Sequence, residues 1–170
     1  MSNEAPVTDL ASSSPQWLAP LEYLERQVSG ELTESQRTHF AYPTAISRLL
    51  GFRVIGIAPR AATLEFHADT AKHGNQQGTI HGGTLAELAD AAIGTAHSTV
   101  VGRDESFTSI DLRMTFLRPV WSATLTAEAS AEHAGRTISH YRCEISSDGR
   151  LIAIGTGTVM TLSGAGAVGR

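Results

Sequence analysis

One helical stretch, at residues 84–99, constrains the fold most strongly, because it stands between segments with the two-residue alternation of strands. Many of its side chains are small, so that neighbouring backbone can approach the helix closely on several sides. These small residues are Ala86, Ala89, Ala91, Ala92, Gly94 and Ala96. Such a helix is expected at the centre of the fold, wrapped by a sheet.

Strand-like alternation lies on both sides of this helix, in two segments before it and four after it. The first two are turned at Pro59-Arg60, and an Asp148-Gly149 pair between the last two is a strong hairpin signal. Two strands, one long helix and four antiparallel strands predict an α+β domain, with a curled antiparallel sheet around one central helix. The six segments are 52–58, 61–67, 107–117, 123–133, 137–146 and 151–161.

The two ends of the chain differ in composition from this central part. The first residues are acidic and polar, which is typical of disorder, and the last are rich in Gly and Ala, which is typical of a flexible tail. Between the first residues and the first strand, helices are expected at 17–30 and 43–50 as an addition to the main domain. The predicted organisation is a disordered 1–15, helical 16–50, the main domain at 51–162 and the tail at 163–170.

Charge and residue usage exclude several functional classes. A formal net charge of -4 and a single lysine, Lys72, give no basic footprint for nucleic acid. No stretch approaches the roughly 18 apolar residues of a membrane span, and the polar N-terminus is not a secretory signal. Cys143 is the only cysteine and is expected to be a buried structural thiol, so a reducing, cytoplasmic location is favoured. The seven histidines lack the spacing of a helical metal site, and no metal is expected.

Segment 75–90 carries the candidate chemistry. Gly82 and Gly83 at a helix start expose backbone N–H groups that have no acceptor within the helix, and the helix dipole adds partial positive charge there. A carbonyl oxygen gaining negative charge would be stabilised at this point. Alternatively, the two glycines only let the backbone pass close to a neighbour.

A second candidate, Asp90, stands in the middle of the helix among apolar residues. A buried carboxylate there costs several kcal/mol unless it has a partner or a task. The residues one turn away on either side, Ala86 and Gly94, are small, which indicates room for a ligand. Alternatively, Asp90 faces solvent on a polar stripe.

The spacing of Gly82 and Asp90 bears on assembly. Eight residues of helix separate them by about 12 Å. Both cannot act on one carbonyl group, since reacting atoms must approach to about 3–3.5 Å. If both are catalytic, they come from different subunits whose helices pack antiparallel, and a two-fold dimer holds two composite sites.

These residues resemble those of a known family. The stretch His81-Gly82-Gly83 followed by Asp90, together with Asn75, Ser109-Ile110-Asp111 and 116–119 (Phe-Leu-Arg-Pro), is similar to hot-dog thioesterases of the phenylacetic-acid-degradation type. The similarity runs from about residue 47 to 160. It implies a homodimer or dimer of dimers, no cofactor, and acyl-CoA substrates hydrolysed to free acid and CoA.

The resemblance also implies roles for single residues. The Gly82 N–H would polarise the thioester carbonyl, and Asp90 of the partner subunit would activate water or attack directly. Asn75 would help hold the water or the carbonyl, His81 would lie near the carbonyl or orient the loop, and Ser109 would place a hydroxyl beside the water. One related group has Glu, Gln and Thr where this chain has Asp90, Asn75 and Gly94. Its aromatic specificity is therefore not implied here.

Coenzyme A carries phosphates, so arginines are expected at the mouth of the site. Arg118 beside Pro119, Arg136 after a glycine turn, and Arg113 are the candidates. Three further positions are assigned to substrate binding: Gly83, Gly94 and Thr108.

Two alternatives remain open. Glu87 lies one turn before Asp90 and about 60° around the helix, so geometry alone does not exclude it as the acting carboxylate. It falls outside the family pattern and is interpreted as solvated or structural. The fold also hosts hydratases, dehydratases and proteins that bind acyl-CoA without hydrolysing it, and fold alone does not settle chemistry. The combination of Asn75, Gly82 and Asp90 favours hydrolysis.

Overall fold

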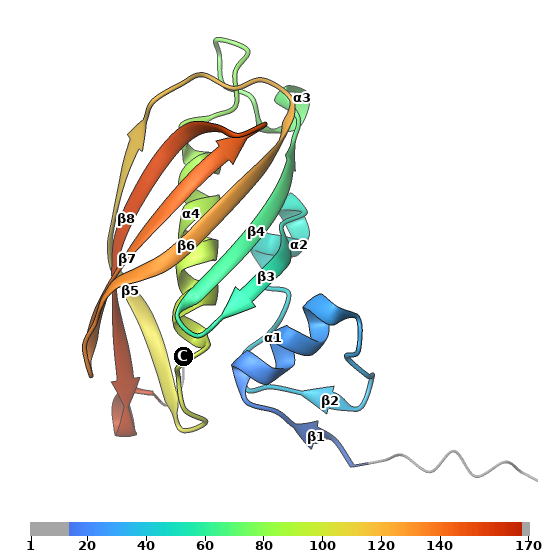
Figure 1. Cartoon of the computed structure of the whole chain (residues 1–170), viewed down its shortest axis with the longest axis vertical. Helices are drawn as coiled ribbons and strands as arrows, with labels where there is room; N and C mark the ends of the chain where they lie inside the picture. Colours follow the sequence, from blue (N-terminus) through green and yellow to red (C-terminus); the bar gives the residue numbers. More distant parts are fainter. Residues whose placement is uncertain (1–13, 168–170) are drawn as a thin grey trace, which may run out of the picture.

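Helix α4 (Gly82–Ser98) lies at the centre of the computed structural model, which describes residues 14–167, and a curled sheet wraps around it (Figure 1). This is the helix expected at 84–99. The sheet has six strands in the order β3-β4-β6-β7-β8-β5, and every neighbouring pair is antiparallel. The predicted α+β architecture is therefore confirmed.

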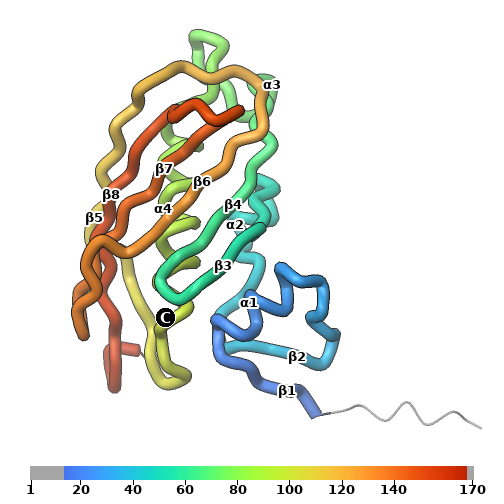
Figure 2. Tube along the Cα trace, in the orientation of Figure 1, coloured from blue at the N-terminus to red at the C-terminus, as the bar shows by residue number. Residues whose placement is uncertain are grey.

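The strand predictions hold to within a few residues at each end, and Figure 2 traces their path. The Asp148-Gly149 turn joins β7 to β8, and both residues have positive φ (48° and 73°), as a type I′ hairpin requires. The strands are β3 (Arg53–Ala58), β4 (Ala61–Ala68), β5 (Glu105–Phe116), β6 (Ala123–Ala134), β7 (Ile138–Ser147) and β8 (Arg150–Ser163).

The core lies between α4 and the concave face of the sheet. Two glycines of β8 let the helix approach. A Cβ at Gly155 would lie 3.2 Å from the Ala89 Cβ, and one at Gly157 would lie 3.2 Å from Cδ1 of Ile93. Both distances are tighter than ordinary packing, so small residues on the strand and on the helix together set the spacing of the two layers. The buried Cys143 belongs to this core, as predicted.

Strand β5 forms one edge of the sheet and is irregular beside the helix. Its pairing with β8 shifts between Ser109 and Asp111, which leaves Ile110 as an extra residue with 53% of its surface exposed. Bulges of this kind bend a strand and re-aim its side chains, and they are common next to active sites.

The segment before the sheet departs in detail from the prediction. The helix expected over 17–30 begins only at Pro20, because the residue before a proline is held in extended conformation and proline favours the first helical position. Trp17 instead pairs with Arg37 in a short parallel bridge. The segment consists of β1 (Gln16–Trp17), α1 (Pro20–Ser29), β2 (Gln36–Arg37) and α2 (Ala45–Leu50).

Helix α2 begins after the Thr44 cap and ends at Gly51, and α1 packs against β3 (Figure 1). The loop expected before α4 contains one helical turn, α3 (Thr70–His73), which Asp69 caps. The expected disorder of 1–15 falls almost wholly on residues 1–13, outside the described part, as do residues 168–170 of the tail. Within the described part, the chain ends in a 3-10 turn, Gly164–Gly166, and no helix is long and apolar enough to span a membrane.

Candidate active site

The first turn of α4 presents one backbone donor. His81 caps the helix, and its Nδ1 accepts a hydrogen bond from the Gly83 N–H at 2.9 Å. The N–H groups of Thr84 and Leu85 point to the His81 carbonyl oxygen at 3.0 and 3.3 Å. No hydrogen bond within residues 14–167 uses the Gly82 N–H. Of the two glycines, Gly82 therefore keeps a free donor at the positive end of the helix dipole.

Gly82 lies at the wall of a cavity of about 290 Å³, here called the glycine cavity. The ring of Phe116, at the end of β5, covers Gly82 so closely that a Cβ there would lie 3.0 Å from the ring Cζ. Arg118 and Asn75, both predicted site residues, line the same cavity. Its full lining is Asn75, Thr79, Ile80, Gly82, Leu85, Phe116, Leu117, Arg118, Pro119 and Val120.

The Asn75 side chain organises its own loop. Its Oδ1 accepts hydrogen bonds from the N–H groups of Gln77 (2.9 Å) and Thr79 (3.2 Å), and its Nδ2 donates to the Thr79 hydroxyl at 2.9 Å. The second N–H of Nδ2 remains as a donor for a substrate or water. Asn75 thus holds the loop that leads into the glycine cavity.

Asp90 belongs to a different cavity. Its side chain is half-buried, and its Oδ1 accepts a hydrogen bond from the Ser109 hydroxyl at 3.0 Å. Ser109 is the residue of β5 immediately before the bulge, so the bulge aims this hydroxyl at the helix. The predicted neighbourhood of Asp90 and Ser109 is therefore present within one chain, and the interaction leaves Oδ2 of Asp90 for another partner.

The aspartate cavity, as we call it, has a volume of about 390 Å³. That is within the usual size range of small-molecule sites. Most of its wall is apolar. It is lined by Gln27, residues 40–47, Phe52, Val54, Leu64, Glu87, Asp90, Ala91, Gly94, Thr95 and Phe107.

Glu87 lines this cavity beside Asp90. Burial raises the pKa of Glu87, and the nearby Asp90 charge raises it further. The interpretation of Glu87 as a solvated or structural carboxylate overlooked this position, because the cavity is closed by residues 40–47, far away in sequence. Within residues 14–167, no three His, Cys, Asp or Glu side chains gather as a metal site would require.

The two cavities have no lining residue in common. Gly82 and Asp90, which the sequence places on one helix, open into separate spaces of the same chain. A single chain therefore does not bring the free Gly82 donor and the Asp90 carboxylate to one ligand.

The remaining predicted residues divide between these places. Gly94 lines the aspartate cavity, where a Cβ would lie 3.6 Å from the Phe107 ring. The Thr108 hydroxyl donates to the Ser109 carbonyl oxygen at 3.4 Å. In the glycine cavity, Arg118 donates from Nη1 to the Leu151 carbonyl oxygen at 2.6 Å. Arg113 on β5 and Arg136 in the β6–β7 turn are both exposed, and neither lines either cavity.

Two parts of the site were not anticipated. The packing of Phe116 over Gly82 joins residues far apart in sequence, and no local pattern signals it. Residues 40–47 form a wall of the aspartate cavity, whereas the sequence predicts this segment only as an addition to the main domain. A usable signal was present in the cluster Phe40, Tyr42 and Pro43, which is unusually apolar for a linker.

Fold and site together define a thioesterase: the chain belongs to the Thioesterase superfamily, whose profile matches residues 77–154. The medium/long-chain acyl-CoA thioesterase YigI of Escherichia coli is 31% identical over 137 residues, covering 71% of this chain and 88% of that protein. The YigI protein of Salmonella typhimurium matches with the same identity and coverage.

Solved structures of thioesterase-type proteins have the same fold as this chain. A mutant of the phenylacetic acid degradation protein PaaI from Thermus thermophilus has a TM-score of 0.65 and 33% identity, covering 69% of this chain and 98% of that one. The PaaI protein of E. coli has a TM-score of 0.68 and 25% identity, covering 85% and 97%. The predicted hot-dog fold and the resemblance to PaaI-type thioesterases are confirmed.

Proposed function

We propose that this thioesterase hydrolyses acyl-CoA thioesters to free acid and CoA at a composite site formed by two copies of the chain. One observation carries the proposal: the free N–H of Gly82 and the carboxylate of Asp90 open into two separate cavities. A two-fold dimer with antiparallel α4 helices would bring Gly82 of one copy to Asp90 of the other. The acyl-CoA substrates named for the YigI relatives support the choice of thioester.

In the proposed reaction, the carbonyl oxygen of the thioester accepts a hydrogen bond from the Gly82 N–H. Asp90, held through Oδ1 by Ser109, takes a proton from water through Oδ2, and the water oxygen attacks the carbonyl carbon. Negative charge then develops on the carbonyl oxygen beside Gly82, where a fixed donor and the helix dipole stabilise it. Breaking the carbon–sulfur bond releases the CoA thiolate, which takes up the proton that Asp90 accepted, and the free acid leaves with Asp90 again ionised.

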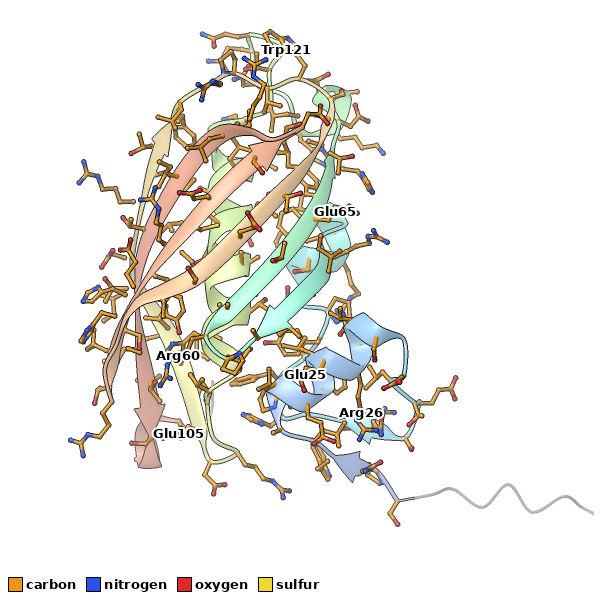
Figure 3. The ribbon with its side chains drawn as sticks, in the orientation of Figure 1. Glu25, Arg26, Arg60, Glu65, Glu105 and Trp121 are labelled. Atoms are coloured by element: carbon orange, nitrogen blue, oxygen red, sulfur yellow. The ribbon has the colours of Figure 1, made fainter. Side chains whose placement is uncertain are left out.

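The edge of the sheet at β5 is the surface we propose for the dimer. An unpaired strand edge is a ready template for another strand. Strand β5 also contributes Phe107 to the aspartate cavity and Phe116 to the glycine cavity, and its Ser109 donates to Asp90. Apolar side chains are exposed along and after it, among them Ile110 (53%), Phe116 (52%) and Trp121 (59%). Trp121 lies at the end of the molecule where α4 begins (Figure 3). Covering these side chains would add hydrophobic stabilisation.

Two further features belong to the proposal. Hydrolysis by a carboxylate, a backbone donor and water needs no cofactor, and we propose none. The buried thiol of Cys143, whose pKa burial raises to about 12, is unreactive as a nucleophile and fits a reducing, cytoplasmic environment.

Thiol release from short-chain, long-chain and aromatic acyl-CoAs tests the reaction directly. We expect turnover of at least one of them, and a loss of kcat of about 10²-fold or more in Asp90→Asn. The asparagine keeps the size of the side chain and the hydrogen bond from Ser109, so unfolding by urea should change little. Wild-type protein that binds acyl-CoA without releasing thiol would instead be a ligand-binding hot-dog protein, and formation of a hydrated or dehydrated product would indicate a hydratase.

A mixed dimer tests the composite site. One copy carries Asp90→Asn and one affinity tag, the other carries Gly82→Pro and a second tag, and the mixed dimer is purified through both tags. If each site uses Gly82 of one copy and Asp90 of the other, one of the two sites is intact, and activity should reach about half that of wild type. A mixed dimer as inactive as its parents would place both residues in one subunit, and failure to recover any mixed dimer would contradict the assembly.

A further inference from the structure

Along α4, the wall of the aspartate cavity changes from carboxyl groups to small residues. Along α4, Glu87 and Asp90 come first, and Gly94 follows one turn later, about 6 Å further along the axis. Beyond Asp90 the cavity is walled by Gly94 and by the ring of Phe107 from β5. An acyl chain whose carbonyl carbon lies at Asp90 therefore extends towards Gly94 and Phe107, away from the Glu87 carboxyl group, because apolar atoms gain by leaving polar surroundings.

Phe40 stands at the end of this path. Its ring packs edge-on against Phe107, with ring centroids 5.3 Å apart. The ring of His39 lies 4.2 Å away, centroid to centroid. The Phe40 ring is therefore in contact with two other rings, although it belongs to the irregular segment between β2 and α2.

A second cavity begins on the far side of Phe40. This outer cavity has a volume of about 560 Å³, and Phe40 is the one lining residue that it has in common with the aspartate cavity. Its walls have a larger polar share than those of the aspartate cavity. Besides Phe40, they are formed by His39, Arg103, Asp104, Glu105, Ser106, Gly164 and Ala167.

We propose that Phe40 is a specificity-determining residue that closes the aspartate cavity and sets the upper limit on acyl-chain length. This inference rests on the proposed function. In the wild type, methylene groups between Asp90 and Phe40 are buried against apolar walls, and those beyond this length meet the Phe40 ring. Removing the ring joins the aspartate cavity to the outer cavity and gives longer chains a continuous path.

The more polar walls of the outer cavity determine how removal of the Phe40 ring should change the dependence of kcat/KM on chain length. Each methylene group gains by burial in apolar surroundings, and a more polar cavity returns less of this gain. Opening the wall should therefore flatten the dependence of kcat/KM on chain length, by removing a penalty on long chains. Chains short enough to end before Phe40 should be affected little.

The test compares kcat/KM for butanoyl-, octanoyl-, dodecanoyl- and hexadecanoyl-CoA in wild type and Phe40→Ala. We expect the ratio of hexadecanoyl to octanoyl kcat/KM to rise about tenfold or more in Phe40→Ala, a typical effect of shape in an apolar pocket. Phe40→Trp should shift the limit the other way and lower kcat/KM for the longest chain that the wild type accepts. The tryptophan variant keeps the wall in place, so that it also tests the inference if the alanine variant unfolds.

Leu49→Ala is the matched control. Leu49 belongs to the neighbouring helix α2, is 78% exposed and lines neither cavity, so its chain-length profile should match that of wild type. Unchanged profiles in both Phe40 variants, with wild type active, would overturn the inference and leave the proposed function intact. If wild type releases no thiol, the proposed function fails, and the same four ligands measured by calorimetric binding still decide whether Phe40 limits chain length.

Discussion

The polar groups in the two halves of α4 lie in different surroundings: those of the first half line cavities, and those of the second half are hydrogen-bonded in the core. In the first half, the Gly82 N–H has no partner within the described chain, and the Glu87 and Asp90 carboxyl groups line a cavity. In the second half, His97 is 1% exposed, and its two ring nitrogens lie 3.0 Å from the Tyr141 and Thr161 hydroxyl oxygens. A hydroxyl group of the second half is also paired within the helix, because Ser98 Oγ donates to the Thr95 carbonyl oxygen at 2.7 Å.

This difference separates groups that serve a ligand from groups that serve the fold. Partly buried polar groups that line a cavity are available to a ligand, whereas a fully buried polar group without a partner would cost about 1–3 kcal/mol. The polar groups of the second half are paired inside the protein, and we expect them to affect stability and leave the chemistry unchanged. The Gly82 N–H and the Asp90 carboxyl group of the first half should behave in the reverse manner.

The strongest test of the first half removes the backbone N–H donor of Gly82. In Gly82→Pro the donor is lost, but the helix can tolerate the change, because proline is favoured at the first helical position and the preceding His81 is already extended (φ -66°, ψ 135°). We expect kcat to fall by about 10²–10³-fold, the usual scale for one oxyanion donor. Thiol release measured at saturating acyl-CoA gives this value.

Gly82→Ala is the matched control for the proline variant. Its Cβ meets the Phe116 ring as the proline Cβ does, but it keeps the N–H. Phe116 is half-exposed and can shift, so we expect the alanine variant to lose much less activity than the proline variant. Equal losses in both would show that crowding by Phe116 matters and that the N–H does not.

The sequence predicts the first half better than it predicts the walls around it. The long helix and the six strands follow from periodicity, because each element buries one face against its neighbours. Asp90 stands out locally as a carboxylate in an apolar helix, and Ser109 was found through the family resemblance. What periodicity cannot give is tertiary contact between distant segments. The cover of Phe116 over Gly82, the role of 40–47 as a wall and the position of Glu87 inside the cavity all depend on such contacts.

The second half of α4 should respond to pH through stability. Burial, and to a smaller extent the nearby Arg60 charge, lower the pKa of His97 from 6.5 to about 4. In the unfolded chain His97 takes up a proton near pH 6.5, while the folded protein keeps it neutral until about pH 4. The free energy of unfolding should therefore decrease as pH falls from 6.5 towards 4, by about 3 kcal/mol in total. Urea unfolding at a series of pH values measures this slope.

His97→Gln is the variant that identifies the source of the slope. Glutamine offers a donor and an acceptor to Tyr141 and Thr161 but does not titrate in this range. Its stability should be lower at neutral pH, because the packing against Tyr141 and Phe107 is lost, and it should vary less between pH 6.5 and 4. A slope equal to that of wild type would assign the effect to other groups. Thiol release at neutral pH, per folded molecule, should be nearly unchanged.

Substitution of Glu87 should have the smallest effect on kcat. It tests whether a carboxyl group that lines the aspartate cavity must also take part in catalysis. Glu87 lines the same cavity as Asp90, but only Asp90 accepts a hydrogen bond from Ser109. We therefore assign the catalytic function to Asp90 and not to Glu87. We expect Glu87→Gln to change kcat by less than about threefold. A loss as large as that of Asp90→Asn would instead make Glu87 the acting carboxylate.

The pKa of Glu87 gives this variant a second readout. A carboxyl group whose pKa is raised on folding favours the folded state below its unfolded pKa, and it loses that contribution as pH rises through the folded pKa. Glu87→Gln removes this loss, so its stability relative to wild type should increase at neutral pH. A Glu87→Gln variant that gains stability and keeps its activity would show two things. The ionised Glu87 destabilises the folded protein, and hydrolysis does not need its carboxylate.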